Sequence, residues 1–166
     1  MPAAAIKLDI MSDPICPWCY IGKTYLDRAL EQNSDHPFQI EWHPFQLNPD
    51  MPPEGMDRRA GIEGRQTAAV SSLFKAYFVE GRDIGDIDTL SDIADGIELD
   101  AAVIRRLLDS DADQQQIIDR DAHSRKMGIT SVPTFIVAGK HAVPGAQPPE
   151  LWSKVIAELN EQESNS

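Results

Sequence analysis

The chain has 166 residues, of which 42% are apolar and 25% are charged, and these fractions are typical of one globular domain. Its formal net charge is −12, with 15 Lys and Arg residues scattered among 27 Asp and Glu residues, which argues against binding to nucleic acid or to an anionic membrane. The sequence has no apolar run of the roughly 20 residues that span a bilayer and no visible secretory signal, so we expect a reducing, cytoplasmic location.

The N-terminal part is predicted to contain a strand, a helix and a second strand. Apolar residues at every second position of 6 to 10 predict a strand that ends just before the two cysteines. Residues 19 to about 31 show helical spacing, so a helix follows this strand directly. The proline-rich residues 43 to 56 are expected to form a loop. The second strand is predicted from the alternating residues Phe38, Ile40 and Trp42.

The middle of the chain is predicted to be helical. One helix should end near Gly81, and two short helices should begin at the N-cap residues Asp88 and Asp100. A further helix is expected over about 112 to 127. The apolar face of the first helix consists of Val70, Leu73, Phe74, Tyr77 and Phe78. The two short helices should end near Gly96 and Asp109.

Toward the C-terminus the pattern returns to β structure. Residues 134 to 138 and 141 to 143 are predicted strands joined by a tight turn, and a final helix begins near Pro148 and Pro149. The element order is thus β-α-β, a block of helices, and β-hairpin-α. A helix between two strands favours a parallel pair, which the hairpin extends into a mixed four-stranded sheet. We therefore predict an α/β, thioredoxin-like fold in a single domain, residues 1–166.

Both cysteines lie in the sequence CPWC, residues 16 to 19, between the first strand and its helix. Such a pair fits half of a zinc site, a structural disulfide or a reversible redox pair. Zinc needs two further ligands, and the four histidines form no compact ligand pair: His36, His43, His123 and His141. A reducing compartment argues against a structural disulfide. The position of the pair favours redox chemistry, and no metal site is predicted.

The start of the helix predicts different roles for the two thiols. If Cys16 is the N-cap and Pro17 the first helical residue, the amides of Trp18 and Cys19 point toward the Cys16 sulfur. These donors and the positive end of the helix favour a thiolate, so Cys16 is predicted to be the attacking thiol. Cys19 is expected to be more buried, to stay protonated longer and to resolve the mixed disulfide that Cys16 forms.

Four segments of the sequence carry a family resemblance: SDPICPWCYIGK (12 to 23), WHPFQLNPDMPPEGMDRR (42 to 59), FKAYFVEGRDIGD (74 to 86) and GITSVPTFIVAGKHAVPGAQPPE (128 to 150). On these segments the chain resembles the DsbA-like thioredoxin superfamily, and in particular its FrnE-type dithiol-disulfide oxidoreductases. The resemblance implies an enzyme, a thiol-disulfide oxidoreductase or isomerase. Its implied partners are disulfide- or thiol-containing proteins or small molecules. No cofactor is implied, although glutathione is a candidate redox partner.

The resemblance also implies substrate-binding residues. A late proline in this superfamily is cis and lies against the CxxC pair, which implies that Pro133 is cis and that Val132 presents its backbone to an extended substrate peptide. Pro17 and Trp18 are further candidates, although Trp18 could equally pack on a neighbouring loop. Asp9 is interpreted either as an acid that assists proton transfer to the buried cysteine or as a solvent-facing residue.

The chain departs from the family in its helical insertion. We infer that part of this insertion is absent near Arg59 to Gly61, which leaves a shortened insertion of about 57–111 between core segments of about 5–45 and 112–160. From this loss we expect an open redox centre. We also expect uncovered apolar surface, which favours self-association into a homo-oligomer.

Two other functions remain open. Hydroxychromene-carboxylate isomerases and kappa-class glutathione transferases share this scaffold, so one alternative is a glutathione-dependent isomerase or transferase. These relatives usually have serine where a redox pair has cysteine, which argues against that function. The other alternative is a holdase-like binding protein in which Cys16 and Cys19 play no part. A glutathione-conjugation assay tests the first alternative, and replacement of both cysteines tests the second.

Overall fold

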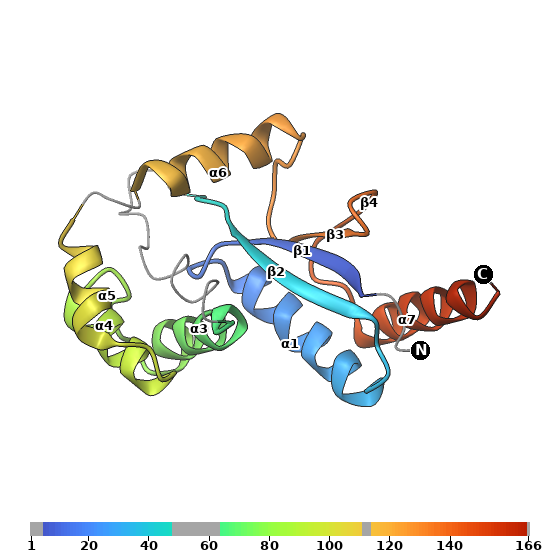
Figure 1. Ribbon diagram of the computed structural model, residues 1–166, viewed down its shortest axis with the longest axis horizontal. Coiled ribbons are helices and arrows are strands. Elements are labelled where there is room, and N and C mark those ends of the chain that lie inside the picture. Colours follow the sequence, from blue (N-terminus) through green and yellow to red (C-terminus); the bar gives the residue numbers. More distant parts are fainter. Residues whose placement is uncertain (1–4, 48–63, 111–113, 166) are drawn as a thin grey trace.

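A four-stranded mixed sheet forms the centre of the computed structural model (Figure 1). The strand order is β2-β1-β3-β4, in which β1 is parallel to β2 and β3 is antiparallel to both β1 and β4. The predicted α/β, thioredoxin-like sheet is therefore confirmed. The strands are β1 (Ile6–Ser12), β2 (Phe38–Pro44), β3 (Thr134–Val137) and β4 (His141–Pro144). The structure describes residues 5–47, 64–110 and 114–165.

Helices cover both faces of the sheet. Figure 1 shows α1 and α7 on one side of the sheet, α6 on the other, and the helices of the insertion gathered beyond one end of the strands. Among the described helices, none is both long enough and apolar enough to cross a membrane. The helices are α1 (Pro17–Gln32), α3 (Gln66–Phe74), the π-helix η1 (Lys75–Val79), α4 (Ile87–Gly96), α5 (Ala101–Leu108), α6 (Gln114–Lys126) and α7 (Pro149–Ser164).

The central strand β1 is buried on both faces. Leu8 and Ile10 belong to the core that lies between the sheet, α1 and α7. Asp9 and Met11 face the opposite side, where residues of α6 lie near them. All five residues from Leu8 to Ser12 are buried. The alternating pattern therefore identifies the strand correctly, but it does not predict that α6 covers the second face.

The helical insertion has a hydrophobic core of its own. Its helix begins as α3 and changes to π geometry at Lys75, which shifts the residues that follow around the helix axis. Leu73 and Phe74, which precede this change, are buried as predicted, whereas Tyr77, which follows it, is exposed. Ile15, from the turn between β1 and α1, packs against this core. The main residues of the core are Leu73, Ile84, Leu90, Ile93, Ala94 and Ile104.

Most predicted helix boundaries are confirmed, with one wrong cap. Asp86, not Asp88, is the N-cap of α4, because its carboxylate accepts a hydrogen bond from the Thr89 N–H at 3.0 Å. Asp100 caps α5 as predicted. The proline-rich loop begins later than expected, because residues 43–44 still belong to β2. Residues 48–56 and the junction near Arg59 to Gly61 lie outside the described residues.

Candidate active site

The two cysteines lie at the N-terminus of α1, directly after the central strand. Cys16 is the N-cap residue, with an extended backbone (φ −85°, ψ 117°), and Pro17 occupies the start of the helix, as predicted. Cys19 lies one turn further along the helix. Both thiols are free, so the structure describes the reduced pair.

The sulfur of Cys16 faces the loop that precedes β3. Its Sγ lies 3.8 Å from the carbonyl oxygen of Val132, to which the thiol donates a weak hydrogen bond. In this thiol form Cys16 makes no side-chain capping hydrogen bond with the helix amides. The reduced thiol is instead oriented toward the loop that contains Pro133.

Cys19 is the deeper of the two thiols, and only 1% of the residue is exposed. Burial raises the pKa of Cys19, and it outweighs the opposing effect of hydrogen bonds from the Asp13 backbone N–H and the Ser12 side chain. Negative charge on Cys16 raises the pKa of Cys19 further. The protein environment therefore keeps the proton on Cys19, as the sequence predicts.

We expect Cys19 to remain protonated at a pH where an ordinary cysteine is ionised. The Cys16→Ser variant keeps Cys19 as its one thiol. A cysteine thiol with the ordinary pKa is half ionised at pH 9.0. Cys19 should be almost wholly protonated there, because a raised pKa moves ionisation to higher pH. The ultraviolet absorbance of the thiolate, followed against pH, measures this. The same titration of the unfolded variant is the control, and half ionisation at pH 9.0 in the folded variant would contradict the expectation.

The loop before β3 is held against the helix that carries the cysteines. The Val132–Pro133 peptide bond is cis, which confirms what the family resemblance implies. Pro133 packs against α1 at Gly22, where an added Cβ would lie 3.0 Å from Pro133 Cγ and 3.5 Å from Phe135 Cζ. The Gly145 N–H donates a hydrogen bond of 2.8 Å to the Pro133 carbonyl. The packing on Gly22 and this hydrogen bond together position the loop.

A Gly22→Ala variant should loosen this contact. The added methyl group has no room beside Pro133, so we expect a loss of about 1–3 kcal/mol in the free energy of unfolding, despite a gain in helix propensity of up to about 1 kcal/mol. Gly96→Ala is the matched control, because its added methyl group meets no atom within 4 Å. Chemical denaturation of both variants measures the difference, and equal stabilities would show that the loop does not pack tightly here.

The redox pair is covered rather than open. Cys16 is 4% exposed and Val132 is 9% exposed, within a cluster to which α3 contributes Phe74. Tyr20 stacks on Phe78 at the edge of this cluster, with ring centroids 5.2 Å apart. The prediction of an open redox centre is therefore wrong for Cys16 and for Val132.

Trp18 is the member of the predicted site that is open to solvent. It is 63% exposed, so most of its side chain is not packed against a neighbouring loop. The apolar face of α3, which we expected to be uncovered, is buried through Leu73 and Phe74. The physical reason for expecting self-association is therefore weakened, and the homo-oligomer stays a prediction.

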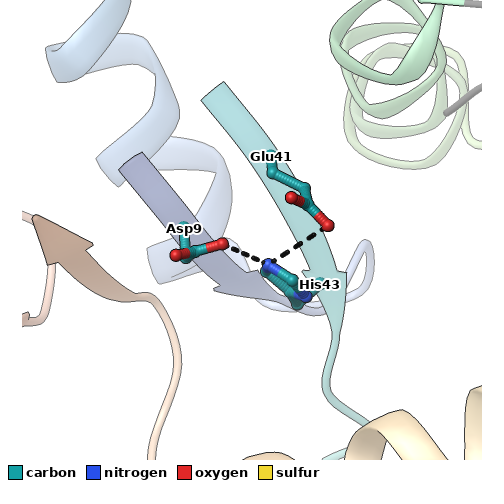
Figure 2. Close-up of side chains that lie close together, drawn as sticks. All are labelled: Asp9, Glu41 and His43. Carbon is teal, nitrogen blue, oxygen red and sulfur yellow. Dashed lines mark hydrogen bonds and ion pairs between the residues drawn. The ribbon is translucent and has the colours of Figure 1, made fainter. Parts of the chain in front are cut away.

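Asp9 belongs to a charged cluster on the α6 side of the sheet. Figure 2 shows Asp9 and Glu41 on either side of His43. Asp9 Oδ1 lies 2.6 Å from His43 Nε2 and 3.0 Å from Lys7 Nζ. At 8% exposure Asp9 is not solvent-facing, and its side-chain partners are these two residues rather than a cysteine. Both interpretations offered for Asp9 from sequence are thus unsupported.

The cluster around His43 could not be found from histidine spacing. The parallel register pairs Asp9 with Glu41 and places His43 beside them, so that their ligand-type atoms lie within 4.8 Å of one another. Lys7 already contacts both carboxylates, and the Arg120 guanidinium lies 3.1 Å from His43 Nδ1. These two cations compensate the acidic charges of the cluster.

Comparison with known proteins gives matches along nearly the whole chain. A family model described as the DSBA-like thioredoxin domain matches residues 7–65 and 59–157. The protein YwbO of Bacillus subtilis (strain 168) is 25% identical over 199 residues, which cover 92% of this chain and 96% of YwbO. That aligned length exceeds the 166 residues of this chain, and the two segments matched by the family model overlap over residues 59–65, which include the junction where we expect residues to be absent.

Solved structures share the fold at low sequence identity. A probable DsbA oxidoreductase from Streptomyces coelicolor has a TM-score of 0.84 at 20% identity, covering 94% of this chain and 90% of its own. A candidate protein disulfide isomerase from Nitrosomonas europaea has a TM-score of 0.79 at 15% identity, covering 95% of this chain and 98% of its own. Both likenesses extend through the helical insertion as well as the sheet.

Proposed function

The chain belongs to the DsbA-like thioredoxin domain family, and we propose that it is a thiol-disulfide oxidoreductase in which Cys16 attacks and Cys19 resolves. The observation that carries the proposal is the placement of the pair. Cys16 caps the N-terminus of α1 beside the Val132 carbonyl, while Cys19 is buried one turn below it. A helix N-terminus favours the thiolate that such exchange requires.

The exchange proceeds in two displacements. The Cys16 thiolate bonds to one sulfur of a substrate disulfide, the substrate S–S bond breaks, and the other substrate sulfur leaves as a thiolate. Cys19 then gives up its proton and attacks the Cys16 sulfur, which forms the Cys16–Cys19 disulfide and releases the second substrate thiolate. The substrate disulfide gains two electrons and the cysteine pair loses them. The same steps in reverse oxidise a substrate dithiol.

The Val132 carbonyl links the state of Cys16 to substrate binding. In the reduced form this carbonyl accepts a hydrogen bond from the Cys16 thiol. A thiolate or a mixed disulfide has no S–H to donate, so the carbonyl becomes available to an N–H group of an extended substrate peptide. The exposed Pro17 and Trp18 lie next to Cys16 and offer apolar contacts to the same peptide.

The proposed partners are proteins or small molecules that contain disulfides or thiols. Glutathione would serve as a redox partner rather than as a bound cofactor, because the chemistry needs only the two cysteine sulfurs. The acidic surface, with its net charge of −12, favours partners other than nucleic acid or anionic lipid. A cytoplasmic location stays a prediction.

The proposal is tested by equilibrating the protein in glutathione buffers of graded redox ratio. We expect one reversible two-electron transition between dithiol and disulfide, together with reduction or isomerisation of a protein disulfide. Conjugation of glutathione to an electrophile without oxidation of the cysteines would favour the transferase alternative. Suppression of aggregation that survives replacement of both cysteines, without any exchange activity, would favour a binding protein.

A further inference from the structure

Asp13 organises the turn that leads from β1 into the CxxC helix. Its carbonyl oxygen accepts the Cys16 N–H at 3.0 Å, and its Oδ1 accepts the Ile15 N–H at 3.1 Å. An aspartate followed by proline is well suited to such a turn, because its side chain bonds the backbone two residues on. The two backbone N–H groups just before the helix are thus both bound by Asp13.

The second oxygen of the same carboxylate reaches a different part of the chain. Asp13 Oδ2 accepts the Leu47 N–H at 2.9 Å, although the two residues are 34 positions apart. We call residues 45–47 the β2 exit segment. Its first residue is also bound to the end of β1, because the Phe45 N–H donates to the Ser12 carbonyl at 3.0 Å.

Helix α6 also holds the β2 exit segment. Asp121 Oδ1 accepts the Gln46 N–H at 2.9 Å, and the Arg125 guanidinium donates to the Gln46 carbonyl at 2.7 Å. The same guanidinium lies over the Phe45 ring, 4.3 Å from its centroid. The segment is therefore clamped between Asp13 and α6.

Phe45 connects the β2 exit segment to the redox pair. It is 2% exposed and lies in the same apolar cluster as Cys16 and Cys19. From these contacts we infer that Asp13 is a positioning residue of the redox centre, whose carboxylate holds the β2 exit segment in place and thereby keeps Cys19 covered and unreactive until a mixed disulfide forms. The inference deepens the proposed function and rests on it for the role of the pair.

The electrostatic setting of Asp13 supports this view. Burial raises the pKa of Asp13, the N–H groups of Leu47 and Ile15 lower it, and the charge of Asp121 raises it. Asp121 is itself paired with Arg125, whose Nε lies 2.8 Å from it. Burial and a neighbouring negative charge both disfavour the charged form of this carboxylate. Buried carboxylates in such surroundings are typically held by specific hydrogen bonds, as Asp13 is.

The test measures the reactivity of Cys19 directly. In a Cys16→Ser background, iodoacetamide should alkylate Cys19 slowly at mildly alkaline pH. Asp13→Asn replaces one acceptor oxygen with an N–H₂ group, which cannot accept a backbone N–H. We expect this change to speed alkylation of Cys19 by about tenfold and to shift its pH profile to lower pH, as a pKa lowered by about one unit would do.

Asp83→Asn is the matched control. Its carboxylate accepts the Gly85 N–H at 2.8 Å, with the same spacing of two residues, but in an exposed turn of the insertion. This variant should alkylate at the rate of the parent. Thermal unfolding of each variant identifies the temperature at which all of them are folded, so that a global loss of stability is not mistaken for a local opening.

Arg125→Gln tests the clamp without changing Asp13. It removes the contacts of α6 with Phe45 and the Gln46 carbonyl, so it should also speed alkylation of Cys19. When Asp13→Asn and Arg125→Gln are combined, the alkylation rate of Cys19 should rise by less than the product of the two single-variant increases, because both residues hold the same segment. If Asp13→Asn does not fold, the Arg125→Gln result decides the matter.

An alkylation rate and pH profile equal to those of the parent in folded Asp13→Asn, or in Arg125→Gln, would overturn the inference. Failure of the proposed function is separate, because it would appear as a lack of disulfide exchange in the unmodified protein. Alkylation of Cys19 needs no such activity. The two failures are therefore distinguishable.

Discussion

A Cys16→Ser variant is expected to lose thiol-disulfide exchange by a factor on the order of a thousand or more, because it removes the nucleophile. The remaining thiol cannot replace it. Cys19 is 1% exposed, and burial raises its pKa, so it offers neither access nor a thiolate to a substrate disulfide. The measurement is the rate of reduction of a protein disulfide at fixed glutathione ratio.

Cys19→Ser is the companion variant, and it should behave differently. It retains the attacking thiol but lacks the group that resolves the intermediate, so mixed disulfides with substrate should accumulate. Non-reducing electrophoresis and intact mass spectrometry detect these adducts. Equal trapping by both variants, or trapping by Cys16→Ser alone, would contradict the assignment of attacking and resolving thiols. Neither change should greatly alter folding, because serine is close to cysteine in size.

The sequence predicts the core of the fold well because its signals are local. Alternation over residues 6 to 10 and the apolar spacing from 19 to 31 each reflect one element and the face that it buries. Pro17 and Pro149 mark helix starts for a reason that depends on their own backbone alone. The structure places β1, α1, the hairpin and α7 accordingly.

The predictions that depend on which surfaces meet are less successful. Asp9 lies on the polar side of the alternation, yet it is buried because α6 packs over that face of β1. We expect Cys16 to be open because the insertion is short, yet it is buried in an apolar cluster to which α3 contributes Phe74 and against which Phe78 of η1 packs. Neither result follows from the local pattern of either segment.

Asp13 shows the same division within a single residue. Its turn with Pro14 and Ile15 could be predicted from the sequence, because these residues are adjacent. Its bond to Leu47 could not, because 34 positions separate the two and the contact exists only when β2 lies beside β1. The part of the site that depends on chain neighbours is thus visible in the sequence, whereas the part that depends on strand pairing is not.

The largest effect on stability is expected from Trp152→Ala. Trp152 is fully buried on α7, and its ring meets Phe135 of β3 at a centroid distance of 4.8 Å and Phe38 of β2 at 6.4 Å, both edge-on. Truncation leaves a cavity between the helix and the sheet and removes both aromatic pairs. We expect a loss of about 3–5 kcal/mol, which is a large share of the roughly 5–15 kcal/mol of a typical domain.

Trp18→Ala is the control within the same chain, because it removes the same side chain from a site that is 63% exposed. Its free energy of unfolding should change by no more than about 0.5 kcal/mol. Denaturant titration followed by circular dichroism measures both variants.

The two variants should also differ in activity. Phe135 also contacts the Gly22 position beside Pro133, so the cavity left by Trp152→Ala should reach the loop before β3. Disulfide exchange should therefore weaken as the fold loosens. Trp18→Ala should instead weaken binding of a peptide substrate while the fold stays intact. Equal losses of stability in the two variants would contradict the placement of α7 on the sheet.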